Sequence, residues 1–216
     1  MKSILVIGLG LFGEKMARKF SELEQEVMAV DSDEVQVQDI LKYVTNAMIG
    51  DATNEGFMRT LGVSDYDLCV VTIGDDFQAS LETVYLLKQL GAKRVVARAS
   101  SDVHEKFLLN NGADEVVYPE KQVAEWSAIA LANDSIFDYI EIDDSCAIYD
   151  IEIPKKWVGH TIANLDIRRQ YHLNIIGMRV NGRIVTDVNP NLVMGAGQRL
   201  LVAGTVESIQ KAFRIK

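Results

Sequence analysis

The chain has 216 residues, of which 48% are hydrophobic, and its formal net charge is −9 at pH 7. This length and apolar content suffice for a buried core in one large domain, or in a full domain joined to a smaller one. A surface that follows nucleic-acid phosphates needs clustered lysine and arginine. The acidic balance therefore argues against DNA or RNA as a partner.

No stretch approaches the ~20 apolar residues of a membrane-spanning helix, and the first residues do not resemble a signal peptide. We therefore expect a cytoplasmic protein that reaches a membrane only through a partner. The two cysteines, Cys69 and Cys146, exclude a disulfide framework. Cys69 lies in the apolar run DLCVVTIG and is expected to be a small buried residue. The three histidines lack the spacing of a zinc site, so no transition metal is expected.

Residues 1–134 alternate β-branched runs with helical segments. The runs are SILVIG, EVMAVD, TNAMIGD, DLCVVTIG, RVVARA and EVVYP. This alternation predicts a Rossmann-like α/β domain, a doubly wound parallel sheet with helices on both faces. In the first helix an apolar stripe should pack on the sheet while charged residues face water. The stripe comprises Phe12, Met16, Phe20 and Leu23, and the charged residues are Lys15, Arg18 and Glu22.

Residues 135–216 have a different pattern. Strand-like runs bounded by turn signals follow one another, namely FDYIEID, CAIYDIEIP, LNIIGMRVNGRIV and QRLLVAGT. Asn181-Gly182 between two such runs predicts a two-residue hairpin turn. Short helices are expected near 161–170 and 205–213. We therefore predict a second, smaller α+β domain over residues 135–216, after a helix at 120–134 that begins beside Pro119.

Three glycines spaced G-x-G-x-x-G interrupt the stretch ILVIGLGLFGEKMARKF, residues 4–20. The motif follows a predicted strand and opens a predicted helix, which is the setting of a dinucleotide-binding loop. Gly8 permits the tight turn, Gly10 lets the backbone approach a phosphate, and Gly13 allows close contact between helix and strand. Free N–H groups at Leu11 and Phe12 would then face the anion.

Further candidate residues follow the predicted strands, where ligands of such sheets bind. Asp31 ends the second run, eighteen residues after Gly13 in the sequence, where a carboxylate accepts hydrogen bonds from ribose and repels a 2′-phosphate. This favours NAD(H) or an adenosine nucleotide over NADP(H). The predicted nucleotide-binding residues are Gly8, Gly10, Leu11, Phe12, Gly13, Asp31, Ser32, Asp51, Ala52, Thr53, Ile73, Gly74 and Arg98.

Several of these residues have a plain structural alternative. Asp31 could serve to cap the next helix through its neighbours Ser32 and Asp33. Asp51 and Thr53 are natural caps for the helix after the third run. Asp75 or Asp76 is expected to cap the helix after the fourth run. Arg98 could contact a phosphate or form a surface salt bridge.

A dehydrogenase also needs an acid or base placed beside the nicotinamide. The sequence offers no such group, and the strand-rich second domain is small for a separate substrate domain. A nucleotide that is bound and not consumed would act as a signal. The alternative is an NAD-dependent oxidoreductase with an unrecognised substrate.

Taken together, IGLGLFG, AVDSD, IGDAT, VTIGDDFQAS, GADEVVYPEK and NLDIRRQYHLNIIGMRVNG resemble the cytosolic regulatory subunits of Ktr and Trk potassium-uptake systems, the RCK family. The resemblance covers essentially the whole chain in the right order. It implies an N-terminal Rossmann lobe that binds ATP, ADP or NAD(H), a C-terminal RCK-C lobe, and no enzymatic activity. It also implies dimers assembled into a ring, commonly an octamer, that docks on a membrane-embedded potassium transporter and gates it. The same sensor could serve another cation transporter or a channel.

The resemblance carries over to particular positions. Glu120 matches a glutamate that coordinates a cation at the dimer interface, although an acid in the first turn of a helix is also favourable on its own. Leu11 departs from the pattern, because Ktr-type members have an arginine there that reaches the terminal phosphate, and this puts ATP selectivity in doubt. In some relatives the second lobe binds cyclic di-AMP at a dimer cleft. The alternative for the matching region of this chain is a dimer core with solvated arginines beside it. The matching residues are Ile162, Ala163, Arg168, Arg169 and Pro190.

Overall fold

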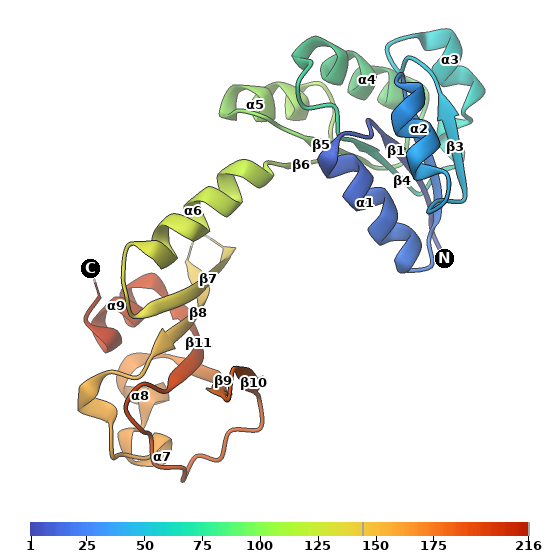
Figure 1. The fold of residues 1–216 in the computed structure, drawn as a ribbon. Helices are drawn as coiled ribbons and strands as arrows, with labels where there is room; N and C mark the ends of the chain where they lie inside the picture. Colours follow the sequence, from blue (N-terminus) through green and yellow to red (C-terminus); the bar gives the residue numbers. More distant parts are fainter. Residues whose placement is uncertain (144, 216) are drawn as a thin grey trace. The chain divides into compact units, whose positions relative to one another are not determined.

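A computed structural model describes residues 1–143 and 145–215, which form two compact units that divide between Glu120 and Lys121. The first unit alternates strands and helices (Figure 1). Its elements are β1 Ser3–Ile7, α1 Leu11–Glu22, β2 Glu26–Asp31, α2 Glu34–Ile40, β3 Asn46–Ile49, α3 Glu55–Thr60, β4 Leu68–Val71, α4 Phe77–Gln89, β5 Val95–Arg98, α5 Asp102–Asn110 and β6 Glu115–Val117, with a 3-10 turn at Val63–Asp65.

The six strands form one parallel sheet in the order β3-β2-β1-β4-β5-β6. Each predicted run contains one strand, so the doubly wound α/β fold is confirmed. The chain reverses its direction of travel across the sheet between β1 and β4, which are hydrogen-bonded neighbours. In open sheets of this kind, ligands bind outside the carboxyl ends of the strands at that reversal.

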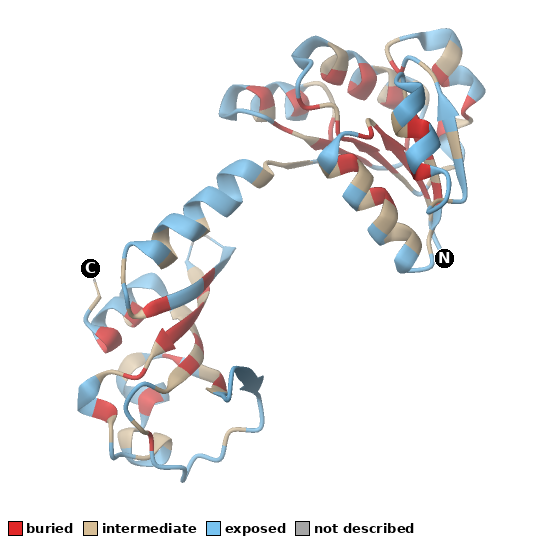
Figure 2. Cartoon of the chain, viewed as in Figure 1, coloured by how far each residue is buried: buried red, intermediate tan, exposed pale blue. Residues whose placement is uncertain are grey.

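Apolar side chains cover both faces of the sheet, and the four central strands β2, β1, β4 and β5 are largely buried (Figure 2). Helix α1 places Gly13 and Ala17 in full burial, while Met16 and Phe20 pack against the same core. The prediction for Leu23 is wrong: the residue is the C-cap of α1 and is 56% exposed. The helix ends one residue earlier than the apolar stripe implies.

A buried histidine joins α4 to α5 and to the end of β5. His104 is fully buried, with Nε2 2.6 Å from Ser80 Oγ and Nδ1 3.1 Å from Ser100 Oγ. The N–H of Ser100 donates to Nδ1, so the neutral ring is the form that fits. Burial, with a smaller contribution from the charge of Arg98, lowers the pKa of His104 below its usual value of 6.5.

This arrangement predicts a loss of stability in mild acid. Between about pH 6.5 and the lowered pKa of His104 in the folded chain, the unfolded chain binds a proton on this histidine that the folded chain does not. The free energy of unfolding therefore falls by up to about 1.4 kcal/mol per pH unit as the pH decreases through this range. Urea unfolding across this range should show that slope in the wild type and a smaller one in His104→Gln. Equal slopes in the two proteins would contradict the assignment. Carboxylates such as Asp51, whose pKa is lowered from 3.8, change the free energy of unfolding only at lower pH.

The second unit is built on an antiparallel sheet in the order β10-β9-β11-β8-β7. The Asn181-Gly182 turn is confirmed, since both residues have positive φ angles, 50° and 79°, and connect paired strands. The elements are α6 Pro119–Leu131, β7 Ile136–Asp143, β8 Cys146–Glu152, a 3-10 turn at Lys155–Trp157, α7 Ile162–Leu165, α8 Ile167–Tyr171, β9 Asn174–Val180, β10 Arg183–Val185, β11 Arg199–Thr205 and α9 Val206–Phe213.

The core of this unit gathers Trp157, Tyr149 and Phe213 with the inner faces of β8, β9 and β11. Trp126 and Ile129 of α6 pack against it, so α6 from Lys121 onward belongs by its contacts to the second unit. The sequence pattern predicts 120–134 as the end of the first domain instead. No helix within residues 1–143 and 145–215 combines the length and the apolar character needed to cross a membrane.

Candidate functional site

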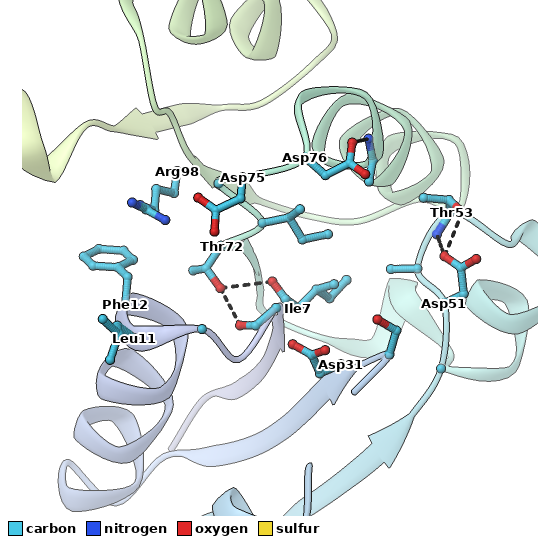
Figure 3. A pocket seen from close by; sticks show the side chains of 18 of the residues that line it. Ile7, Leu11, Phe12, Asp31, Asp51, Thr53, Thr72, Asp75, Asp76 and Arg98 are labelled. Atoms are coloured by element: carbon cyan, nitrogen blue, oxygen red, sulfur yellow. Dashed lines mark hydrogen bonds between the residues drawn. The ribbon is translucent and has the colours of Figure 1, made fainter. Parts of the chain in front are cut away.

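A cavity of about 910 Å³ lies at the carboxyl ends of the parallel strands and at the start of α1. A volume of this size can hold a nucleotide or dinucleotide. Figure 3 shows Leu11, Phe12 and Arg98 at one end, Asp51 and Thr53 at the other, and Asp31 between them. The lining residues are Ile7, Gly8, Gly10, Leu11, Phe12, Lys15, Asp31, Ser32, Gly50, Asp51, Ala52, Thr53, Thr72, Ile73, Gly74, Asp75, Asp76, Ala79, Arg98 and Glu120.

The glycine loop is held against β2 and β4. Gly8 has a φ angle of 93°, a conformation that side chains disfavour, and its N–H donates to Val30 O at 2.8 Å. The buried hydroxyl of Thr72 lies 2.5 Å from Gly8 O and 3.1 Å from Ile7 O. The loop therefore has a fixed conformation before any ligand arrives.

The loop ends in an uncapped helix N-terminus. Gly10 is the N-cap of α1 and makes no side-chain capping hydrogen bond to the first turn. The N–H groups of Leu11, Phe12 and Gly13 have no acceptor within the helix, because those of a first turn never do. They and the positive end of the helix dipole are available to an anion.

Asp31 connects the glycine loop to the end of β2. Its Oδ2 accepts the N–H of Leu9 at 2.6 Å, and its Oδ1 accepts the N–H of Asp33 at 2.9 Å. Asp33, not Asp31, caps α2 by accepting the N–H of Val35. Asp31 therefore acts on the start of α2 only through Asp33, whose N–H it accepts, and its oriented carboxylate on the cavity wall suits a ribose.

The acids after β3 and β4 have separate tasks. Asp51 Oδ1 accepts from the hydroxyl of Thr53 at 2.7 Å and from its N–H at 2.9 Å, and these bonds lower the pKa of Asp51. Asn54 caps α3, so the capping role expected for Asp51 and Thr53 is wrong. Asp76 caps α4, as predicted for one of the pair after β4, by accepting the N–H of Ala79.

Arg98 pairs with an acid of the same unit. Its Nη2 donates to Glu120 Oε1, and its side chain is 18% exposed. The guanidinium lies against Gly74, where a Cβ would overlap it, and 5.8 Å from the ring centre of Phe12. The pKa of Glu120 is lowered, first by the hydrogen bond from its own backbone N–H and then by Arg98.

The cavity brings together twelve of the thirteen predicted nucleotide-binding residues and also Glu120. Gly13 is the exception: it lies behind the loop in contact with Gly8 and Thr72. The remaining lining residues are not predicted from the sequence motifs. They are Ile7, Lys15, Gly50, Thr72, Asp75, Asp76 and Ala79. Lys15 could have been predicted as a lining residue from the sequence, because it follows Leu11 by one helical turn on the same face.

Replacing Thr72 by valine should weaken nucleotide binding without unfolding the protein. Valine keeps the shape of threonine but removes the hydroxyl that holds Gly8 O. The loop must then be ordered by the ligand, and we expect a loss in affinity of about threefold to tenfold, the value of one hydrogen bond. Calorimetric titration with ADP measures it. An unchanged affinity would show that the hydroxyl does not organise the loop.

The five residues predicted for a second ligand lie around α7, α8 and the segment before β11. The N–H of Ala163 donates to Pro190 O at 2.9 Å, which holds two of these segments together. Arg169 Nη1 lies 3.9 Å from Asp166 Oδ2. A cavity in this unit is lined by other residues, including Arg179 and Arg199. The cyclic di-AMP assignment stays a prediction.

No group of three or more histidine, cysteine, aspartate and glutamate side chains suited to a metal occurs among the described residues. Cys69 is fully buried, as predicted, and burial raises the pKa of its thiol to about 12. Glu120 stays a predicted cation ligand.

Two curated relatives match nearly the whole chain. Ktr system potassium uptake protein C of Bacillus subtilis is 34% identical over 97% of this chain and 95% of its own length. Ktr system potassium uptake protein A of the same organism is 30% identical over the same shares.

Two solved structures share the fold. The GsuK channel bound to NAD superposes with a TM-score of 0.70 over 98% of this chain and 38% of its own, at 19% identity. GsuK bound to ADP gives 0.53 over 62% of this chain and 36% of its own, at 17% identity. The RCK region of that channel therefore has the architecture seen here.

The TrkA-N domain family matches residues 4–119, which contain every lining residue of the cavity except Glu120, and the TrkA-C domain family matches residues 146–216. These matches and the relatives above assign both units of the molecule to known domain families. The chain belongs to the TrkA-N/TrkA-C family of Ktr and Trk potassium-uptake proteins.

Proposed function

We propose that this protein is a nucleotide-sensing regulatory subunit of a potassium-uptake system. The observation that carries the proposal is the cavity at the strand-order reversal, where the glycine loop, the uncapped start of α1 and the Asp31 carboxylate line one space. Family membership supports the link to potassium uptake.

The ligand is an adenine nucleotide or NAD(H). The adenosine end lies toward Asp51 and Thr53, the ribose lies against Asp31, and the phosphates face the N–H groups of α1. Asp31 repels a 2′-phosphate, so NAD(H) or an adenosine nucleotide is favoured over NADP(H). The GsuK structures bound to NAD and to ADP, which share this fold, support these two classes of ligand.

Regulation needs two states with different affinities for the ligand. The cavity lies in the first unit, and Glu120, which pairs with Arg98 on its wall, is the second residue of α6. Helix α6 continues into the core of the second unit. A ligand that draws Arg98 away from Glu120 alters the start of this helix. In a homo-oligomeric ring, an octamer by resemblance, such a change would act on the membrane-embedded transporter at the cytoplasmic face.

Potassium uptake by cells that carry the membrane-embedded transporter subunit tests the proposal. Cells that also produce this chain should take up potassium, and cells that produce Asp31→Ala should show altered uptake at equal protein level. The matched control is Asp33→Asn. Asp33 does not line the cavity, and asparagine at this position still caps α2. Uptake that is the same with and without this chain would overturn the proposal.

Two finer assignments are part of the proposal and need their own tests. Glu120 is proposed to ligate a cation at a dimer interface, and the second unit is proposed to bind cyclic di-AMP near Arg168 and Arg169. Calorimetric titration with calcium, magnesium, sodium and cyclic di-AMP would decide each. The protein is proposed not to be an enzyme, and hydride transfer from NADH to any small carbonyl compound would contradict that.

A further inference from the structure

Helix α1 carries three basic residues that differ in their surroundings. Arg18 pairs with Glu14 and lies over the ring of Tyr43. Lys19 Nζ lies 2.8 Å from Glu22 Oε2. Lys15 is exposed and, within residues 1–143 and 145–215, has no acidic partner, yet it alone of the three lines the nucleotide cavity.

The cavity is otherwise poor in available positive charge. Its wall carries five carboxylates, and Arg98, the second basic residue there, is paired with Glu120. The carboxylates are Asp31, Asp51, Asp75, Asp76 and Glu120. A ligand diphosphate that enters this acidic space needs a cation, and in the described part of the wall Lys15 is the one without an acidic partner.

The position of Lys15 suits that task. It follows Leu11 by four residues, so the two lie on one helix face about 6 Å apart along the axis. Leu11 is 85% exposed at the helix start and offers the ligand only its backbone N–H. The long side chain of Lys15 is mobile and can carry its ammonium group back toward the helix N-terminus, the direction in which helical side chains lean.

We propose that Lys15 binds the diphosphate of the nucleotide and determines how strongly the site responds to phosphate charge. This inference rests on the proposed function of the cavity. The ammonium group is a point charge with no fixed fork of donors, so it recognises the charge of a diphosphate and not the detailed shape of a terminal phosphate. Two ligand classes with a diphosphate, ADP and NADH, should both depend on it, and adenosine should not.

Calorimetric titration of nucleotide-stripped protein with ADP, NADH and adenosine tests this. In Lys15→Gln the dissociation constants for ADP and NADH should rise about tenfold or more, the effect of losing one charge-assisted contact, while that for adenosine stays within about twofold. Lys19→Gln is the matched control, because Lys19 lies on the same helix, is paired with Glu22 and does not line the cavity.

A rescue variant separates charge from folding. In Leu11→Arg/Lys15→Gln a cation returns to the same helix face one turn earlier, and we expect ADP affinity to recover most of the loss. If Lys15→Gln bound ADP with the same affinity as the wild type, the role of Lys15 would be overturned and the proposed function would remain intact. Failure of the wild type to bind any of the three ligands would instead overturn the proposed function itself.

Discussion

Replacing Asp31 by alanine is expected to weaken the binding of ADP and NADH by about 100-fold. The carboxylate accepts the N–H groups of Leu9 and Asp33, which fixes its direction on the cavity wall. Hydrogen bonds from ribose hydroxyls to a charged acceptor are worth about 1.5–3 kcal/mol each. Alanine removes these and also leaves the two backbone donors without their acceptor, so loop order is lost as well. Calorimetric titration measures the change.

The control for this result is Asp33→Asn. Asparagine caps a helix as well as aspartate does, so α2 and the end of β2 should keep their structure. We expect this variant to bind ADP within about twofold of the wild type. If Asp31→Ala bound ADP as tightly as the wild type while folding normally, the ribose role of Asp31 would be refuted.

Replacing Gly13 by alanine is expected to lower the free energy of unfolding by about 3 kcal/mol or more. Gly13 is fully buried, and a Cβ there would overlap Gly8 O and Thr72 Oγ1. Both atoms belong to the hydrogen-bonded loop that joins β1, α1 and β4, so neither can move without breaking a contact. Overpacking in such places usually costs about 1–3 kcal/mol, and the rigid backbone neighbour puts this site at the upper end. Urea unfolding measures the loss.

Gly10→Ala is the matched control, because it changes the same loop by the same methyl group. A Cβ at Gly10 meets no atom within 4 Å, and the residue has a φ angle of −60°, which alanine adopts readily. Stability should therefore stay within about 0.5 kcal/mol of the wild type, whereas ADP binding should weaken because the methyl group keeps the phosphate away from the backbone. Equal stability of Gly13→Ala and Gly10→Ala would contradict the packing account.

The sequence predicted the sheet well because its signals are local. Each of the six strands is an apolar run bounded by turn residues, and the glycine motif lies between one strand and one helix. The strand-end residues Asp31, Asp51 and Arg98 were found for the same reason, since parallel strands bring their carboxyl ends to one edge.

Contacts between distant residues could not be predicted in this way. Thr72 reaches Gly8 only because β4 lies beside β1, 64 residues away in the chain. Glu120 reaches Arg98 across 22 residues, so the pairing of the arginine depends on where β6 ends and α6 begins. Helix caps were misassigned where several capping residues adjoin, as at Asp51, Thr53 and Asn54, because only the backbone geometry selects one of them.

Isothermal titration calorimetry of nucleotide-stripped protein with ADP, NADH and NADPH tests the central claim most directly. The account predicts that ADP or NADH binds at one site per chain. NADPH should bind at least about tenfold more weakly, because Asp31 repels its 2′-phosphate. In Asp31→Ala the preference for NADH over NADPH should be lost. Absence of heat with ADP and NADH, in protein shown to be folded, would contradict the claim that this cavity holds a nucleotide.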